Sequence, residues 1–270
     1  MKKAIIAIVL SLMLVFSLVG TASAITSGSL DGNGHPYVGL MVALDADGAP
    51  LWRCTGTLLS STVFLTAGHC TESPAARAVV WFESDIQSQQ AALGYPYGGA
   101  TSHAGTVYGH PQFDTNAFYL HDLGVVVFDA PVTEITTYGK LPQLNQLDQY
   151  KKVKKTVYFT SVGYGLQKAF PDATSWKDSA LKIRMVANPR LIQIGVPGQG
   201  DDFAILLSNN SNTGGTCFGD SGGPNFLLNT NVVAGVTSYG KNSTCGGTGG
   251  VYRVDKADDL AWLATFGVHP

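Results

Sequence analysis

The stretch Gly219-Asp220-Ser221-Gly222-Gly223-Pro224 places a single serine in an acidic, glycine-rich turn. Two earlier stretches, Leu65-Thr66-Ala67-Gly68-His69-Cys70 and His121-Asp122-Leu123-Gly124-Val125-Val126, put a histidine and an aspartate before that serine. A serine hydroxyl is a weak nucleophile at neutral pH. It needs a base, and the base needs a carboxylate that holds it in the correct tautomer. The three stretches together predict nucleophilic catalysis by Ser221.

The first 24 residues form a separate segment. Lys2 and Lys3 precede an apolar run over residues 4–19, and Ala22-Ser23-Ala24 follows with the small residues that a signal peptidase recognises. We interpret residues 1–24 as a secretory signal peptide. The alternative is a retained membrane anchor, but the apolar run is short for a bilayer span.

The composition favours a β-rich protein and excludes some partners. The net charge is −2, which gives no reason to expect nucleic acid or another polyanion as a partner. Charged residues make up only 13% of the chain and there are 32 glycines, as expected for many short strands joined by tight turns. Long amphipathic helices do not alternate with the strands, which disfavours a parallel α/β sheet.

Short runs rich in Val, Leu, Tyr and Phe predict strands, and one helix is expected at the C-terminus. In that helix Asp255 is the expected cap, Leu260, Leu263 and Phe266 line one face, and Gly267 ends it. The predicted strands are Tyr37–Leu44, Thr57–Leu65, Ala78–Phe82, Gly124–Phe128, Thr156–Val162, Ala204–Leu207 and Val232–Tyr239.

In the order and spacing of its motifs the chain resembles the chymotrypsin/trypsin family of serine proteases, over essentially all of the sequence after residue 24. The resemblance implies two packed antiparallel six-stranded β-barrels with a C-terminal α-helix. Residues 25–148 would form the barrel with His69 and Asp122, and residues 149–270 the barrel with Ser221. Further matches are His35-Pro36-Tyr37-Val38, Cys54-Thr55-Gly56-Thr57-Leu58-Leu59, His110-Pro111-Gln112-Phe113, Gly163-Tyr164-Gly165, Ser238-Tyr239-Gly240 and Gly250-Val251-Tyr252.

The resemblance also implies the role of each catalytic residue. Ser221 is the expected nucleophile, His69 the general base and then acid, and Asp122 the residue that orients His69. The backbone N–H groups of Gly219 and Ser221 are the expected oxyanion hole. The serine motif also satisfies the G-x-S-x-G pattern of α/β-hydrolases. That fold needs a histidine after the serine, and only His269, next to the C-terminus, follows.

Four cysteines are present, and an exported protein is expected to hold them as disulfides. The sequence alone leaves all three pairings open. The resemblance implies the pairs Cys54–Cys70 and Cys217–Cys245. No cofactor or metal is expected.

A specificity pocket is implied by the same resemblance. Gly215 would lie at its base, with Ser238-Tyr239-Gly240 and Gly249-Gly250-Val251 as its walls. Phe218 would flank the entrance, or else cover the Cys217–Cys245 bridge as a surface aromatic residue. An open pocket without a charge at its base predicts cleavage after large apolar or aromatic residues.

Signal removal is expected to complete the site. In the family, a new N-terminal Ile or Val turns inward and its ammonium pairs with the Asp beside the nucleophile. Here cleavage after Ala24 would expose Ile25 as the partner of Asp220. The next residues, Thr26-Ser27-Gly28, depart from the family's apolar residue and paired glycines. Activity should decline as the pH rises past the raised pKa of the amine.

We therefore predict a secreted serine endopeptidase that acts on polypeptides through an acyl-enzyme. It should be a monomer without stable membrane association after signal removal. Two alternatives remain at this point: a catalytically silent binding protein on the same fold, and an enzyme that chiefly cleaves esters.

Overall fold

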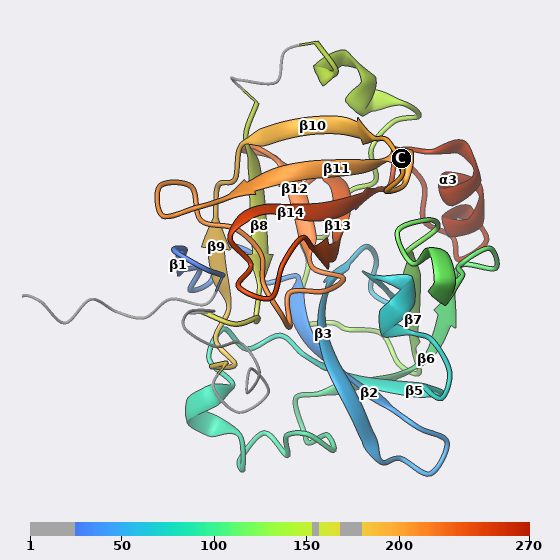
Figure 1. Ribbon diagram of the computed structural model, residues 1–270. Helices are drawn as coiled ribbons and strands as arrows, with labels where there is room; N and C mark the ends of the chain where they lie inside the picture. Colours follow the sequence, from blue (N-terminus) through green and yellow to red (C-terminus); the bar gives the residue numbers. More distant parts are fainter. Residues whose placement is uncertain (1–24, 153–156, 168–179) are drawn as a thin grey trace, which may run out of the picture.

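Two antiparallel β-sheets form the framework of the computed structural model, which describes residues 25–152, 157–167 and 180–270 (Figure 1). The predicted signal peptide, residues 1–24, lies outside these ranges. Within the described ranges no helix is both long enough and apolar enough to span a bilayer.

The first sheet closes into a barrel in the order β2-β3-β4-β7-β6-β5. Its strands are rich in Val, Leu and Phe, and their inward side chains, such as Leu40, Phe64 and Trp81, are fully buried in one core. The strands are β2 (Val38–Leu44), β3 (Pro50–Leu58), β4 (Val63–Thr66), β5 (Arg77–Trp81), β6 (His103–Gly109) and β7 (Gly124–Phe128).

The second sheet has eight strands in the order β1-β9-β8-β12-β13-β14-β11-β10. The predicted all-β class is confirmed, but this half is a curled sheet with more strands than the predicted six. One reason is that the short N-terminal strand β1 adds to its edge beside β9. The strands are β1 (Ser29–Leu30), β8 (Phe159–Gly163), β9 (Met185–Ala187), β10 (Leu191–Val196), β11 (Asp201–Asn209), β12 (Pro224–Leu227), β13 (Val233–Gly240) and β14 (Gly247–Arg253).

The C-terminal helix α3 (Ala257–Ala264) is present, but its predicted cap is wrong. Lys256 is the N-cap residue, and no side chain caps the helix. The carboxylate of Asp255 instead accepts hydrogen bonds from the fully buried guanidinium of Arg253 and from the backbone N–H of Leu147. A buried cation requires a carboxylate partner. The Asp255 side chain binds the Arg253 guanidinium for this reason and does not cap the helix.

Polar contacts join the two halves along their boundary. Asp31, near β1, forms a buried ion pair with Arg184, whose guanidinium also donates to the carbonyls of Val38 and Phe82 in the first half. Thr55 in β3 donates its backbone N–H to the carbonyl of Ser221. The predicted division at residues 148/149 falls in the connection between β7 and β8, and it stays a prediction.

Candidate active site

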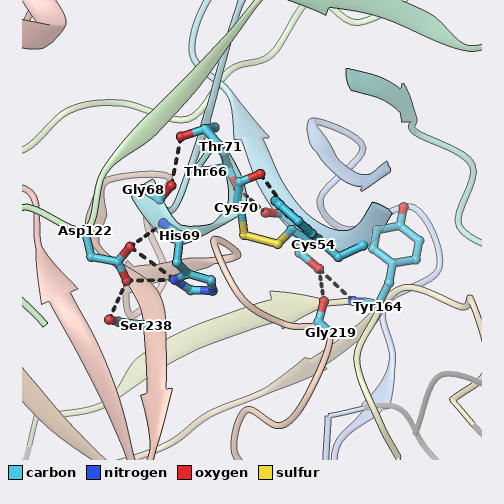
Figure 2. The surroundings of a disulfide bond; sticks show 12 residues. Cys54, Thr66, Gly68, His69, Cys70, Thr71, Asp122, Tyr164, Gly219 and Ser238 are labelled. Carbon is cyan, nitrogen blue, oxygen red and sulfur yellow. Dashed lines mark hydrogen bonds and ion pairs between the residues drawn. A yellow bond between two sulfur atoms is a disulfide. The ribbon is translucent and has the colours of Figure 1, made fainter. Parts of the chain in front are cut away.

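His69 and Asp122 lie together because β4 and β7 are neighbours in the barrel. Thr66 at the end of β4 is opposite Gly124 at the start of β7, so the residues just outside both strands meet. The Asp122 carboxylate accepts the backbone N–H of His69 at 2.9 Å and faces Nδ1 of its ring at 3.0 and 3.1 Å (Figure 2). These contacts hold the imidazole on its Nδ1 side and leave Nε2 on the other side of the ring.

Ser238 from the second sheet also binds this carboxylate. Its hydroxyl donates to Oδ2 of Asp122 at 2.5 Å, and Figure 2 shows it beside the carboxylate. Asp122 is fully buried, and a buried polar side chain needs hydrogen-bond partners such as these. The sequence predicted Ser238 only as a wall of the specificity pocket. Its contact with Asp122 joins residues 116 positions apart, which no local sequence pattern predicts.

The environment of His69 favours the charged ring. Burial lowers the pKa of His69, but the charge and hydrogen bond of Asp122, aided by the charge of Glu72, outweigh it. The resulting pKa lies above the usual 6.5. A more basic imidazole is a better proton acceptor once it is neutral.

Ser221 lies on the loop before β12, against the segment that carries His69. A Cβ atom added to the next residue, Gly222, would lie 2.0 Å from Thr66 Oγ1 and 2.7 Å from the backbone nitrogen of Ala67. Ser221 and Ser238 are among the residues that line one cavity. Among the described residues, no hydrogen bond joins Ser221 Oγ to His69, a link that often forms only when substrate is bound.

The backbone around Ser221 leaves two N–H groups unused. Asp220, Gly222 and Gly223 donate theirs to the carbonyls of Cys217, Thr237 and Asp220. Within the described part of the chain, the N–H groups of Gly219 and Ser221 donate to no protein acceptor. These two donors can bind an oxyanion.

Gly219 is held in the backbone conformation that orients its N–H. It has φ of 93°, a region that favours glycine, and its carbonyl accepts the Thr55 hydroxyl at 2.9 Å. The preceding carbonyl, of Phe218, accepts the N–H of Leu166 at 2.7 Å. Thr55 was not predicted as a site residue, because its partner is 164 positions away in the chain.

The cavity beside Ser221 has a volume of about 120 Å³. It brings together four of the predicted pocket residues, whereas Gly215 and Gly250 do not line it. No carboxylate, ammonium or guanidinium is among its lining residues, and burial raises the pKa of the Tyr239 phenol to about 12, so it is neutral. The lining residues are Thr216, Cys217, Phe218, Ser221, Thr237, Ser238, Tyr239, Gly240 and Cys245.

Asp220 is fully buried, and its carboxylate accepts the N–H groups of Gly165 and Cys217 at 2.8 and 2.9 Å. Burial raises its pKa to about 7, and these two N–H groups and the charge of Arg53 only partly oppose the rise. Ile25 is also fully buried, but it packs against Met185 and Ala187. No ion pair links Ile25 to Asp220 in the described residues.

Both implied disulfides are present. Cys54–Cys70 joins β3 to the turn carrying His69, and Cys217–Cys245 joins the serine loop to the segment before β14 (Figure 2 shows the first). The bonds therefore brace the two loops from which the candidate catalytic groups project. Cys217 and Cys245 also line the cavity with Phe218, so Phe218 lies beside both the cavity and the bridge.

A cluster next to Asp122 has the residue types of a metal site but an unsuitable proton arrangement. Ligand atoms of His110, His121 and Asp259 lie within 4.8 Å of one another. However, Nδ1 of His110 accepts the N–H of Gln112, so the neutral ring carries its hydrogen on Nε2, which faces Asp259. That nitrogen has no lone pair to offer a cation.

Known proteins with related sequences and folds are proteases for the most part. Collagenase from Hypoderma lineatum is 26% identical over 78% of this chain and 74% of its own length. Trypsin from Saccharopolyspora erythraea is 29% identical over 81% and 87%. A structure of HL collagenase superposes with a TM-score of 0.70 at 23% identity, covering 91% of this chain and all of that one. Human heparin binding protein has the same fold, with a TM-score of 0.64 at 19% identity and coverage of 89% and 96%.

The family model named Trypsin matches residues 31–260, which includes all three candidate catalytic residues. This range covers most of the chain and every strand of the two sheets except β1. The chain therefore belongs to the trypsin family of serine endopeptidases.

Proposed function

We propose that this chain is a secreted endopeptidase that hydrolyses polypeptides with Ser221 as nucleophile, His69 as base and Asp122 as orienting carboxylate. The observation that carries the proposal is the buried Asp122 carboxylate. It binds His69 from the first half and Ser238 from the second, next to the two unused N–H groups of the serine loop.

The reaction would proceed in two stages. Oγ of Ser221 attacks the scissile carbonyl carbon while Nε2 of His69 takes the hydroxyl proton, and Asp122 stabilises the resulting imidazolium. The oxyanion accepts hydrogen bonds from the N–H groups of Gly219 and Ser221, each worth about 2.7–4 kcal/mol in the transition state. His69 then protonates the leaving amine, and water hydrolyses the ester left on Ser221 by the same route reversed.

The cavity supports a preference for large apolar or aromatic residues before the scissile bond. Its lining offers the Phe218 ring, the Cys217–Cys245 bridge and an uncharged phenol, with no charge to pair with lysine, arginine or glutamate. Gly240 has no side chain that would narrow it. An apolar side chain entering this cavity gains about 25 cal/mol for each Å² removed from water.

Maturation at Ile25 is the second part of the proposal. An ammonium at residue 25 would pair directly with the buried Asp220 carboxylate, whose burial the charge of Arg53 only partly offsets. It would also hold the serine loop in the form that exposes both N–H groups. The backbone of Thr26 forms an antiparallel β-bridge with Gly215, which precedes the serine loop. The segment that begins at Ile25 therefore lies close to that loop. As the pH rises past the raised pKa of the amine, the pair is lost and activity falls.

Covalent labelling tests the assignment directly. A serine-directed aryl phosphonate should react with Ser221 in the secreted protein, and the adduct should be located by peptide mass mapping. Ser221→Ala should abolish labelling and casein hydrolysis, whereas Ser211→Ala, at an exposed serine outside the site, should keep both.

Absence of the adduct on correctly matured protein would favour a silent binding protein on this fold. Heparin binding protein, with a similar fold, is named for binding. Labelling without casein hydrolysis would instead indicate an esterase. N-terminal sequencing tests maturation separately, and a start other than Ile25 would refute that part.

A further inference from the structure

Asn209, the last residue of β11, has a buried polar side chain that binds the backbone of a residue lining the substrate cavity. It is 3% exposed, and its Nδ2 donates to the carbonyl of Thr216 at 2.9 Å. Thr216 lines the cavity, so Asn209 holds the backbone of a wall residue. A buried amide is stable only when its polar atoms have partners.

Thr26 of the N-terminal segment supplies the second partner of this amide. Its hydroxyl lies 2.5 Å from Oδ1 of Asn209 and donates to it, and it is also 3.1 Å from the carbonyl of Gly215. The backbone N–H of Gly215 donates to the Thr26 carbonyl at 3.1 Å.

Gly215 itself has no room for a side chain. A Cβ atom at this position would lie 2.4 Å from Cγ and 2.6 Å from Cβ of Asn209. Asn209 therefore occupies the space that a side chain at the expected pocket base would fill. The Asn209 side chain of β11 fits here because Gly215 has no side chain.

We propose that Asn209 supports the floor of the substrate cavity and that Thr26 holds it in place, so both are positioning residues for substrate binding. The proposal rests on the proposed function. It explains why a polar pair is buried here: the segment released by signal cleavage becomes part of the support of the cavity. Within the part of the chain that the structure describes, Thr26 and Asn209 form no hydrogen bond with His69, Asp122 or the N–H groups of Gly219 and Ser221. Their loss should therefore weaken binding without slowing the chemical step.

The test is the split between KM and kcat in Thr26→Val, which keeps the shape of the side chain and removes its hydroxyl. With a chromogenic peptide ending in phenylalanine, KM should rise about three- to tenfold, the range expected for one lost hydrogen bond, with kcat within about twofold. Thr26→Ser, which keeps the hydroxyl, should restore the parent KM. Intact mass must show the same N-terminal residue in every variant.

Two further variants separate positioning from general destabilisation. Thr160→Val is the matched control, because Thr160 in the same sheet also donates its hydroxyl to an asparagine amide, that of Asn188, away from the cavity. It should leave KM unchanged. Asn209→Ala should raise KM at least as much as Thr26→Val, and adding Thr26→Val to it should have no further effect. An unchanged KM in Thr26→Val, or an equal rise in Thr160→Val, overturns the proposal.

A binding measurement keeps the inference separate from the proposed chemistry. Calorimetric titration of indole into Ser221→Ala protein reports the cavity without any turnover. Thr26→Val should weaken indole binding by the same three- to tenfold. If the parent protein hydrolyses nothing but this weakening is seen, the proposed function fails and the inference stands. If turnover is normal and indole affinity is unchanged by Thr26→Val, the inference fails alone.

Discussion

The pKa of Asp220 predicts how stability changes with pH before and after maturation. While residue 25 is still an amide, the buried carboxyl has a pKa of about 7 instead of 3.8. Between these two values the folded chain keeps a proton that the unfolded chain has released, so stability falls as the pH rises. At about 1.4 kcal/mol per pH unit, the loss is about 4 kcal/mol by pH 7.

Two chains measure this effect, both carrying Ser221→Ala to prevent self-digestion. One starts at Thr21, so that residue 25 remains an amide, and the other starts at Ile25. The free energy of unfolding in urea is measured from pH 4 to pH 8, and each curve is compared with the same chain carrying Asp220→Asn. The asparagine side chain cannot ionise, so subtracting the curve of that variant removes the contribution of every other titrating group.

The longer chain should lose about 3 kcal/mol relative to its Asp220→Asn form between pH 4 and pH 7, because part of the total loss falls below pH 4. The chain starting at Ile25 should lose much less, because its ammonium stabilises the ionised carboxylate and lowers its pKa. Identical difference curves for the two starting points would refute the pairing. A flat difference curve for the longer chain would refute the raised pKa.

Three further predictions concern the site, and a fourth concerns stability. Asp122→Asn should lower kcat about 10⁴-fold, as in this family's type example, while Ser221 remains open to direct acylation by a reactive ester. The acid limb of kcat/KM should lie above pH 6.5, because His69 must lose its proton to act as base and its pKa is raised; a limb below 6.5 would contradict this. Gly219→Ala, at φ of 93°, should lower kcat at least about 10²-fold by turning its N–H away. Replacing both Cys217 and Cys245 by serine should lower the free energy of unfolding by about 3.6 kcal/mol in a urea titration, the chain-entropy value for a loop of 28 residues.

Local patterns predicted the strands well where one strand forms one apolar run. Gly124–Phe128 is an example, with the same ends in sequence and structure. The predicted strand Thr57–Leu65 was wrong because it spans the turn between β3 and β4. There the Ser60 hydroxyl accepts the N–H groups of Thr62 and Val63, a local turn signal hidden between leucines and valines.

The candidate catalytic residues could be found from sequence because each lies in a distinctive short motif. Contacts between such motifs are different. Thr26 and Asn209 are 183 positions apart, and neither lies in a sequence motif from which their hydrogen bond could be predicted. The same is true of Ser238 and Asp122, 116 positions apart. Those contacts depend on how the two sheets pack, which a local pattern does not encode.

Each disulfide closes a loop inside its own half, so the polypeptide backbone is the sole covalent tie between the histidine side and the serine side of the site. Split into two separately synthesised pieces, the enzyme would have to rebuild its active centre by association alone. Turnover would then rise with the product of the two fragment concentrations until all of the scarcer fragment is bound. The catalytic rate would therefore measure the affinity of the two halves for each other.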